Sequence, residues 1–233
     1  MKEVEELLEI NPRDYDNVVL PEEEILKWFA IAEAGWVHSG DLKDPHAELT
    51  SGLCSTAFFD CLRLLKYPNI AEILGRQLGK RLKEADIGKV DWVVSPAYAA
   101  ITFGHEVAKE LGAIFMNVEK DPSDPKQKRM LWRRMTIPAE AKVLSVEELI
   151  TTSSTFKEVQ RAVIEGNTET VNFIPTVGVL VHRPPDLELI DYKAIAVMEK
   201  EVPAYDPNEC PLCKAGSKRY RPKTHWKQLT GKA

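Results

Sequence analysis

Residues 143–155 read VLSVEELITTSST, and this segment carries the most information about the fold. It begins with a short, mostly apolar run that is typical of a strand buried on both faces. Two acids, Glu147 and Glu148, come next, and the hydroxyl residues 151–155 then lead into a helical sequence at 156–166. Because the first backbone N–H groups of a helix have no partner within it, this order predicts an anion site. The paired acids suit ribose hydroxyls or a hydrated Mg²⁺, whereas the simpler interpretation is an ordinary helix cap.

The composition excludes several classes of function. A chain of 233 residues is long enough for one α/β domain with appendages. The formal net charge is −5 and the acids and bases are interleaved, which argues against a nucleic-acid partner. No apolar run approaches the roughly 20 residues that cross a bilayer, and the acidic amino terminus has no signal-peptide core. We therefore expect a cytoplasmic protein without a membrane partner.

Other elements lie on both sides of this stretch. Apolar stripes and helix start and stop signals predict helices over 3–10, 21–34, 68–83 and 101–111. Apolar runs predict strands at 91–94, 113–118, 171–181 and 194–197. The loop-rich segment 35–61 contains two Ser-Gly pairs, which indicate hairpins. The turn at 95–100, SPAYAA, is a second candidate anion loop between a strand and a helix, although a tight turn is the simpler interpretation.

A long polar loop covers residues 119–135, EKDPSDPKQKRMLWRRM. Loops of this length inside a compact α/β domain are usually functional or disordered, and a basic one can close over a polyanion. A solvated turn explains the same charges without any ligand.

The carboxyl-terminal segment is basic and contains Cys210-Pro-Leu-Cys213. Such a pair can bind zinc, but a structural zinc site normally has four ligands. Cys54, Cys61 and His225 are the candidates to complete the set, none of them at a diagnostic spacing. We favour a docking tail with reduced thiols, and zinc bound at Cys210 and Cys213 is the alternative.

The stretch 143–155 resembles the phosphoribosyl pyrophosphate (PRPP) fingerprint of type I phosphoribosyltransferases: an apolar strand, two acids, two apolar residues, then Thr, Ser and Gly. The motif is divergent, since the family usually has Asp and Gly where this chain has Glu148, Ser153 and Ser154. Four further features resemble orotate phosphoribosyltransferases in the same order. They are the hood pattern at 49–59, the pyrophosphate loop at 95–100, the basic loop at 119–135, and His182-Arg183 followed by the tail.

The resemblance, which runs from Pro21 to Leu229, implies an α/β fold. The expected architecture is a doubly wound, mainly parallel sheet with an N-terminal helix and hood (1–62), a core (63–202) and a basic C-terminal tail (203–233). It also implies transfer of ribose 5-phosphate from PRPP to a base, with orotate as the preferred base, in pyrimidine biosynthesis. Mg²⁺ is the implied cofactor, and a homodimer is the implied assembly.

The resemblance implies a role for each matching residue. The expected catalytic residues are Glu147, Glu148, Lys120 and Lys128. PRPP is expected to contact Thr151, Thr152, Ser153, Ser154, Thr155, Ala97, Tyr98 and Ala99. The base is expected to contact Phe58, Phe59 and Arg183. The departures from the motif leave a second interpretation open, a homologue that binds PRPP or a nucleotide without turnover, as a sensor or regulator.

Overall fold

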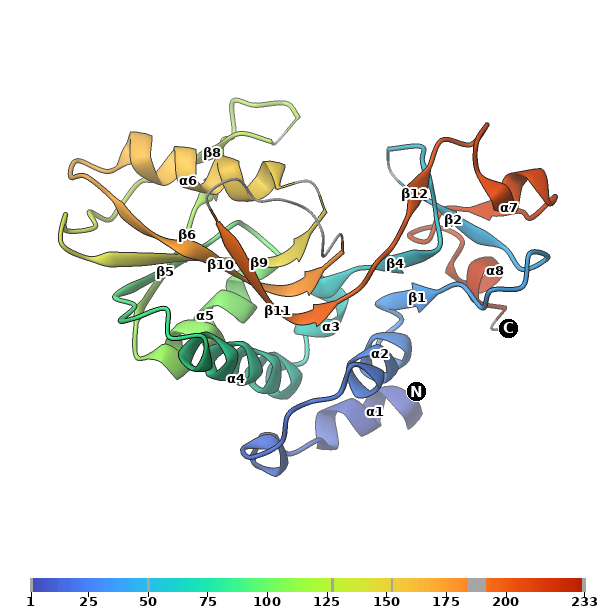
Figure 1. Ribbon diagram of the computed structural model, residues 1–233, viewed down its shortest axis with the longest axis horizontal. Helices are drawn as coiled ribbons and strands as arrows, with labels where there is room; N and C mark the ends of the chain where they lie inside the picture. Colours follow the sequence, from blue (N-terminus) through green and yellow to red (C-terminus); the bar gives the residue numbers. More distant parts are fainter. Residues whose placement is uncertain (1, 50, 127, 152, 184–191, 232–233) are drawn as a thin grey trace. The chain divides into compact units, whose positions relative to one another are not determined.

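The computed structural model describes residues 2–49, 51–126, 128–151, 153–183 and 192–231, and these form two compact units (Figure 1). The first, which we call the core unit, comprises Leu8–Leu20 and Leu65–Lys200. The second, which we call the hood unit, comprises Met1–Leu7, Pro21–Leu64 and Glu201–Ala233. The hood unit therefore combines segments from both ends of the chain.

In the described part of the core unit, five strands form a parallel sheet in the order β11-β10-β9-β5-β6. Their bounds are β5 (Trp92–Ser95), β6 (Ile114–Asn117), β9 (Lys142–Ile150), β10 (Asn172–His182) and β11 (Lys193–Glu199). The three central strands β5, β9 and β10 are mostly apolar and buried, as parallel strands covered on both faces must be, and the edge strands β6 and β11 are more exposed. The α/β class and the mainly parallel sheet are confirmed.

Helices cover both faces of this sheet (Figure 1). Helices α4 (Pro68–Glu84) and α5 (Ala100–Leu111) lie on one face, and α6 (Ser154–Gly166) lies on the other. Close packing of α4 on α5 requires Gly75, because a Cβ atom there would lie 2.5 Å from Cβ of Glu106. These helices are therefore rigid supports for the loops that precede them.

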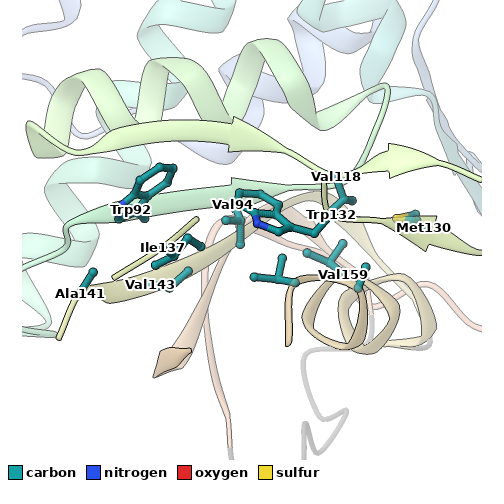
Figure 2. Packing of buried hydrophobic residues seen from close by; sticks show 11 residues of the cluster. Trp92, Val94, Val118, Met130, Trp132, Ile137, Ala141, Val143 and Val159 are labelled. Carbon is teal, nitrogen blue, oxygen red and sulfur yellow. The ribbon is translucent and has the colours of Figure 1, made fainter. Parts of the chain in front are cut away.

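A cluster of apolar side chains fills the space between the sheet and α6. Figure 2 shows Trp92, Val94 and Val143 from the strands facing Val159 of α6. The ring of Trp132, from the return segment of the basic loop, packs edge-on against Trp92 with 6.4 Å between the ring centroids. The basic loop is thus anchored in the core at its carboxyl end.

The order of the strands locates the ligand site. The chain passes from β5 to β6 on one side, then returns to place β9 on the other side of β5. Ligands of doubly wound sheets bind beyond the carboxyl ends of the strands where the order reverses. The turns after β5 and β9 lie at that point.

The hood unit is built from short strands. An antiparallel pair joins β1 (Gly35–Val37) to β4 (Ala57–Phe59). A second sheet has the order β12-β3-β2-β13 and contains one of the predicted hairpins, β2 with β3 around Ser51-Gly52. In the described segment 2–49, no hairpin forms at Ser39-Gly40, because β1 and β2 on either side of it belong to different sheets. Its strands are β12 (Ala204–Tyr205), β3 (Cys54–Ser55), β2 (His46–Glu48) and β13 (Arg219–Tyr220). Strands from the tail therefore flank strands from the amino-terminal region.

Short elements complete the chain. They are α1 (Lys2–Glu9), a 3-10 turn (Pro12–Tyr15), α2 (Glu22–Ile31), α3 (Cys61–Leu65), β7 (Glu119–Lys120), β8 (Met130–Leu131), α7 (Pro211–Lys214) and α8 (Trp226–Thr230). The predicted helices are all present, within a few residues of the expected bounds. Among the described residues, no helix has the length and apolar character needed to span a membrane.

Residues 143–155 differ from the prediction in two respects. Strand β9 does not stop at Val146 but continues through both acids to Ile150, because Glu147, Leu149 and Ile150 keep their pairing with β10. Helix α6 likewise begins at Ser154, earlier than expected. The acids are therefore held by the sheet itself and not by a loop.

Candidate active site

The two acids lie near the carboxyl end of β9. Successive side chains of a strand point to opposite faces, so Glu147 shares the α6 face with Val143, and Glu148 faces the other way. Glu147 is 2% exposed and lines a small cavity together with Thr151 and residues 153–155. Among the described residues, Oε1 of Glu147 has no hydrogen-bond partner. A buried carboxylate oxygen with no partner points to a ligand.

The electrostatics of Glu147 support this conclusion. Burial raises the pKa of Glu147 well above its usual range, and the neighbouring charge of Glu148 adds to the shift. The positive charge of Lys120 acts in the opposite direction. The ionised form of Glu147 therefore needs further positive charge or hydrogen-bond donors in order to be stable.

The hydroxyl-rich turn connects β9 to α6. Ser153 has a φ of 59°, a left-handed conformation that favours glycine. It occupies the position of a family glycine, so a serine here adopts the backbone that glycine usually provides. Thr151, Ser154 and Thr155 are exposed, and the first turn of α6 follows directly. The turn has the geometry of an anion-binding helix start; Thr152 lies outside the described residues.

The turn after β5 lies next to the acids. Val94 pairs with Ser145 of β9, so the following residues leave the sheet at the level of Val146 and Glu147. The peptide bond between Ala97 and Tyr98 is cis. Ala97 is buried, Tyr98 is 66% exposed and Ala99 is half-buried. The predicted pyrophosphate loop is thus at the same sheet edge as the predicted ribose-binding acids.

The basic loop is folded around one aspartate. Strands β7 and β8 form its antiparallel base. The Asp124 carboxylate accepts the backbone N–H groups of Lys126, Lys128 and Arg129 at 3.0, 2.8 and 2.8 Å. These hydrogen bonds lower the pKa of Asp124, the one from Arg129 contributing most. The described part of the loop is therefore an ordered structure with its cations on the outside.

The loop is also tied to α6. The N–H of Met130 donates to Glu158 at 2.7 Å, and Arg161 donates to the carbonyl of Met130 at 2.9 Å. Glu158 and Arg161 form an ion pair of 2.6 Å, and hydrogen bonding to Arg161 lowers the pKa of Glu158. Their spacing of three residues on one helix face could have indicated the pair, but not its contact with the loop.

A cavity of about 700 Å³ lies between the basic loop and one side of α6, from Ser154 to Glu165. Lys120, Lys128 and Arg129 line it from the loop, and Ser154 and Thr155 line it from the helix. The structure thus brings the predicted loop cations and two predicted phosphate-binding hydroxyl residues to the same cavity. Cations facing a helix start form a site for a polyanion.

Arg183 follows β10 at the same sheet edge. Its backbone N–H donates to the carbonyl of Ile150, the last residue of β9, at 3.1 Å. Burial lowers the pKa of Arg183, whose side chain is 9% exposed. The backbone therefore fixes this arginine beside the end of the strand that carries both acids.

The aromatic pair belongs to the hood unit, on β4. The Phe59 ring is 4% exposed and packs edge-on against Phe29, with 5.1 Å between centroids. Phe58 is half-buried and lies 6.5 Å from the Trp226 ring. The contacts of Phe59 are those of a core residue, and Phe58 keeps part of its ring accessible. Thr50, in the same predicted hood motif, lies outside the described residues.

The cysteines of the tail lie in a second cluster. Ligand atoms of His46, Cys54, Cys210 and Cys213 all lie within 4.8 Å of one another. Of the residues expected to complete a metal site, the described cluster contains Cys54 but neither Cys61 nor His225. His46 was not predicted as a possible metal ligand, because nothing in the local sequence relates it to the tail.

Comparison with known proteins identifies relatives. No family model matches the chain. The chain is 33% identical over 175 residues to an orotate phosphoribosyltransferase of Caldicellulosiruptor saccharolyticus, covering 75% of this chain and 86% of the relative. It is 34% identical over 176 residues to the enzyme of that name from Chlorobium phaeobacteroides, covering 75% and 85%. The crystal structure of orotate phosphoribosyltransferase from Aeropyrum pernix superposes with a TM-score of 0.53 at 17% identity, covering 75% of this chain and 93% of that one. This structural likeness supports the fold.

Proposed function

The chain belongs to the orotate phosphoribosyltransferase family, and on this premise we propose that it transfers ribose 5-phosphate from PRPP to orotate and releases pyrophosphate. The observation that carries the proposal is the edge of β9, where two acids, a hydroxyl-rich turn and a helix start follow one another. A sugar phosphate needs that combination: donors for the phosphate and acceptors for the ribose hydroxyls.

The 5-phosphate would bind at the start of α6. The left-handed Ser153 turns the chain so that the following residues enter the helix at once, with Thr155 and Ser154 exposed. Backbone N–H groups and hydroxyls of residues 151–155 are then the donors to the phosphate oxygens. The positive end of the helix dipole adds to their effect.

The ribose ring would lie against Glu147 and Glu148. In the reaction the bond between C1 and the pyrophosphate oxygen breaks, its electron pair leaves with pyrophosphate, and a nitrogen of the orotate anion forms the new bond to C1. The ring gains positive charge as the bond breaks. Two carboxylates fixed on a strand stabilise this charge without having to reorganise.

The departing pyrophosphate would face cations and backbone donors. Residues 97–99 follow the neighbouring strand β5, and Lys120 and Lys128 line the cavity above the helix start. The charge of Lys120 also acts on Glu147, so this lysine would be near both the ribose and the departing pyrophosphate. Positive charge placed where negative charge develops lowers the barrier.

Mg²⁺ fits this edge of the sheet. Carboxylate oxygens are the ligands that Mg²⁺ prefers, and Oε1 of Glu147 is buried without a hydrogen-bond partner among the described residues. Glu147 and Glu148 would hold the ion. When bound, it supplies positive charge that neutralises pyrophosphate. Burial raises the pKa of Glu147 because it disfavours the ionised carboxylate, and a bound cation would stabilise that ionised form.

In the core unit, the base would be placed by Arg183. A guanidinium presents donors in a fixed fork, which matches the planar, anionic orotate. Of the two hood aromatics we assign the base contact to Phe58, because Phe59 is buried against Phe29. We also propose a cytoplasmic homodimer, as the family resemblance implies.

The test is pyrophosphate release by the purified full-length protein with PRPP, Mg²⁺ and orotate. Turnover is expected with orotate, and none with adenine in its place. Turnover with a different base would leave the family intact and show that the substrate is wrong. Binding of PRPP without any release would favour the sensor interpretation instead.

A further inference from the structure

A group of one histidine and three cysteines lies in the hood unit, and none of the four is among the residues assigned to the reaction. His46 opens β2 and Cys54 opens β3, and these two strands pair with each other. Cys210 is the N-cap of the short helix α7 of the tail, and Cys213 lies within that helix. Three of the four residues are fully buried, and Cys213 is half-buried. Backbone pairing therefore holds the ligands from distant parts of the chain together.

The distances within this group match a bound metal ion. Sγ of Cys54 lies 3.6 Å from Sγ of Cys213, and Nε2 of His46 lies 3.4 Å from Sγ of Cys213 and 3.8 Å from Sγ of Cys210. A disulfide has a length of about 2.05 Å, so these sulfurs are not bonded to each other. Around tetrahedral zinc, typical bond lengths place two sulfurs about 3.8 Å apart, and a sulfur and a nitrogen about 3.6 Å apart.

A hydrogen-bonded chain fixes the histidine for coordination. The hydroxyl of Ser217 donates to the carbonyl of Asp44, so its oxygen accepts from Nδ1 of His46 at 2.7 Å. The proton of the imidazole therefore sits on Nδ1, and the lone pair of Nε2 points at the thiols. This arrangement of the outer nitrogen is the usual one for a histidine that binds metal.

Hydrogen bonds from neighbouring groups also hold two of the sulfur atoms in place. The backbone N–H groups of Leu212 and Cys213 donate to Sγ of Cys210, and the side chain of Arg219 hydrogen-bonds to Cys54. Three thiolates and a divalent ion carry a net negative charge, which the guanidinium of Arg219 offsets.

We propose that the hood unit binds one zinc ion through Nε2 of His46 and the sulfurs of Cys54, Cys210 and Cys213. On binding, the three thiols release their protons to solvent and the neutral imidazole releases none. Four protein ligands leave no open position for a substrate, so the ion is structural. It joins the tail to the β2-β3 hairpin and stabilises a unit whose strands are only two or three residues long.

Elemental analysis of the full-length protein, purified with zinc in the growth medium, is the first test. One equivalent of zinc per chain is expected, with an X-ray absorption spectrum that fits three sulfurs at about 2.3 Å and one nitrogen at about 2.0 Å. Replacement by Co²⁺ should give intense thiolate-to-cobalt bands. A wild-type protein without zinc, or one that carries iron instead, would overturn the proposal.

A matched pair of variants assigns the ligands. Cys54→Ala and Cys61→Ala each remove one buried cysteine of the hood unit, but only Cys54 belongs to the cluster. Cys54→Ala should lose the zinc and expose the tail to limited proteolysis, whereas Cys61→Ala should keep the full equivalent. Equal zinc contents in the two variants would contradict the assignment, and the wild-type spectrum decides the case if Cys54→Ala fails to fold.

Discussion

The edge of β9 and the histidine–cysteine cluster are both groups of buried polar side chains, but they are built in opposite ways. At the edge of β9, burial raises the pKa of Glu147, and one of its oxygens has no hydrogen-bond partner among the described residues. In the cluster, Nδ1 of His46 is held by Ser217, and its Nε2 faces sulfur atoms. The first group needs a molecule from solution, and the second needs only an ion that the protein can enclose.

This difference separates a reactive site from a structural one. A reactive site keeps charged groups incompletely paired, so that the substrate and its cation complete the pairing. The free protein is less stable as a result. A closed metal site adds its binding energy to folding. Substitutions at the two groups should therefore have opposite consequences for stability and activity.

The largest effect is expected from Glu148→Ala. The substitution removes one of the two carboxylates that we propose stabilise the ribose ring, so kcat/KM with orotate should fall at least about 100-fold, or about 3 kcal/mol. Steady-state kinetics measure the loss. Glu140→Ala is the control, because Glu140 is an exposed glutamate in the turn before β9. Unchanged kinetics in Glu148→Ala would contradict the assigned role.

A smaller loss is expected from Lys128→Ala. Lys128 lines the cavity above the start of α6, so its removal should lower kcat/KM about 10-fold, or about 1.4 kcal/mol. Lys126 is an exposed cation of the same loop that does not belong to this cavity, and Lys126→Ala should have little effect. If both variants lose activity equally, general loop charge and not a specific contact explains the result.

Glu147→Gln should change stability and activity in opposite directions. Because the folded-state pKa is raised, the folded protein binds this proton more tightly than the unfolded chain does. The stabilising contribution is complete below the ordinary glutamate pKa and is lost as pH rises through the raised value.

Glu147→Gln removes this dependence, so at pH 8 the variant without ligand should melt about 2–4 °C higher, or about 1 kcal/mol, while its turnover falls. Thermal unfolding followed by circular dichroism from pH 5 to pH 8 measures the change. A lower melting temperature across this range would show that Glu147 is already stabilised by its surroundings.

The smallest effect is expected from Ser153→Gly. A non-glycine residue in the left-handed region costs about 1 kcal/mol, and glycine relieves that cost at φ 59° while adding some freedom to the unfolded chain. The variant should be as stable as wild type or up to about 1 kcal/mol more stable, with an equal or lower KM for PRPP. A clear loss of PRPP binding would mean that the Ser153 hydroxyl itself contacts the phosphate.

Local patterns predicted the sites that are continuous in the chain. Residues 143–155 predicted an anion site because the strand, the acids and the hydroxyl-rich turn are adjacent in the sequence. The order of the other motifs along the chain was consistent with the same α/β fold. The extension of β9 to Ile150 depends on pairing with β10, which no local pattern contains. The contact of Glu158 with the basic loop joins residues 28 positions apart and was missed for the same reason.

The histidine of the second cluster shows this limit most clearly. Cys210 and Cys213 left a zinc site open as the alternative to reduced thiols, but His46 lies 164 positions from Cys210 and has no spacing that relates it to the pair. The pairing of β13 with β2 brings the tail to His46. Composition and spacing could not supply this pairing, because strands of two or three residues have almost no sequence signal.

A crystal structure with orotidine 5′-monophosphate tests the central claim most directly. The phosphate is expected on the donors of Thr151 and residues 153–155, the ribose hydroxyls on Glu147 and Glu148, and the carboxylate of the base near Arg183. A nucleotide bound elsewhere, or one bound here while both glutamates pair with other cations of the protein, would contradict that claim.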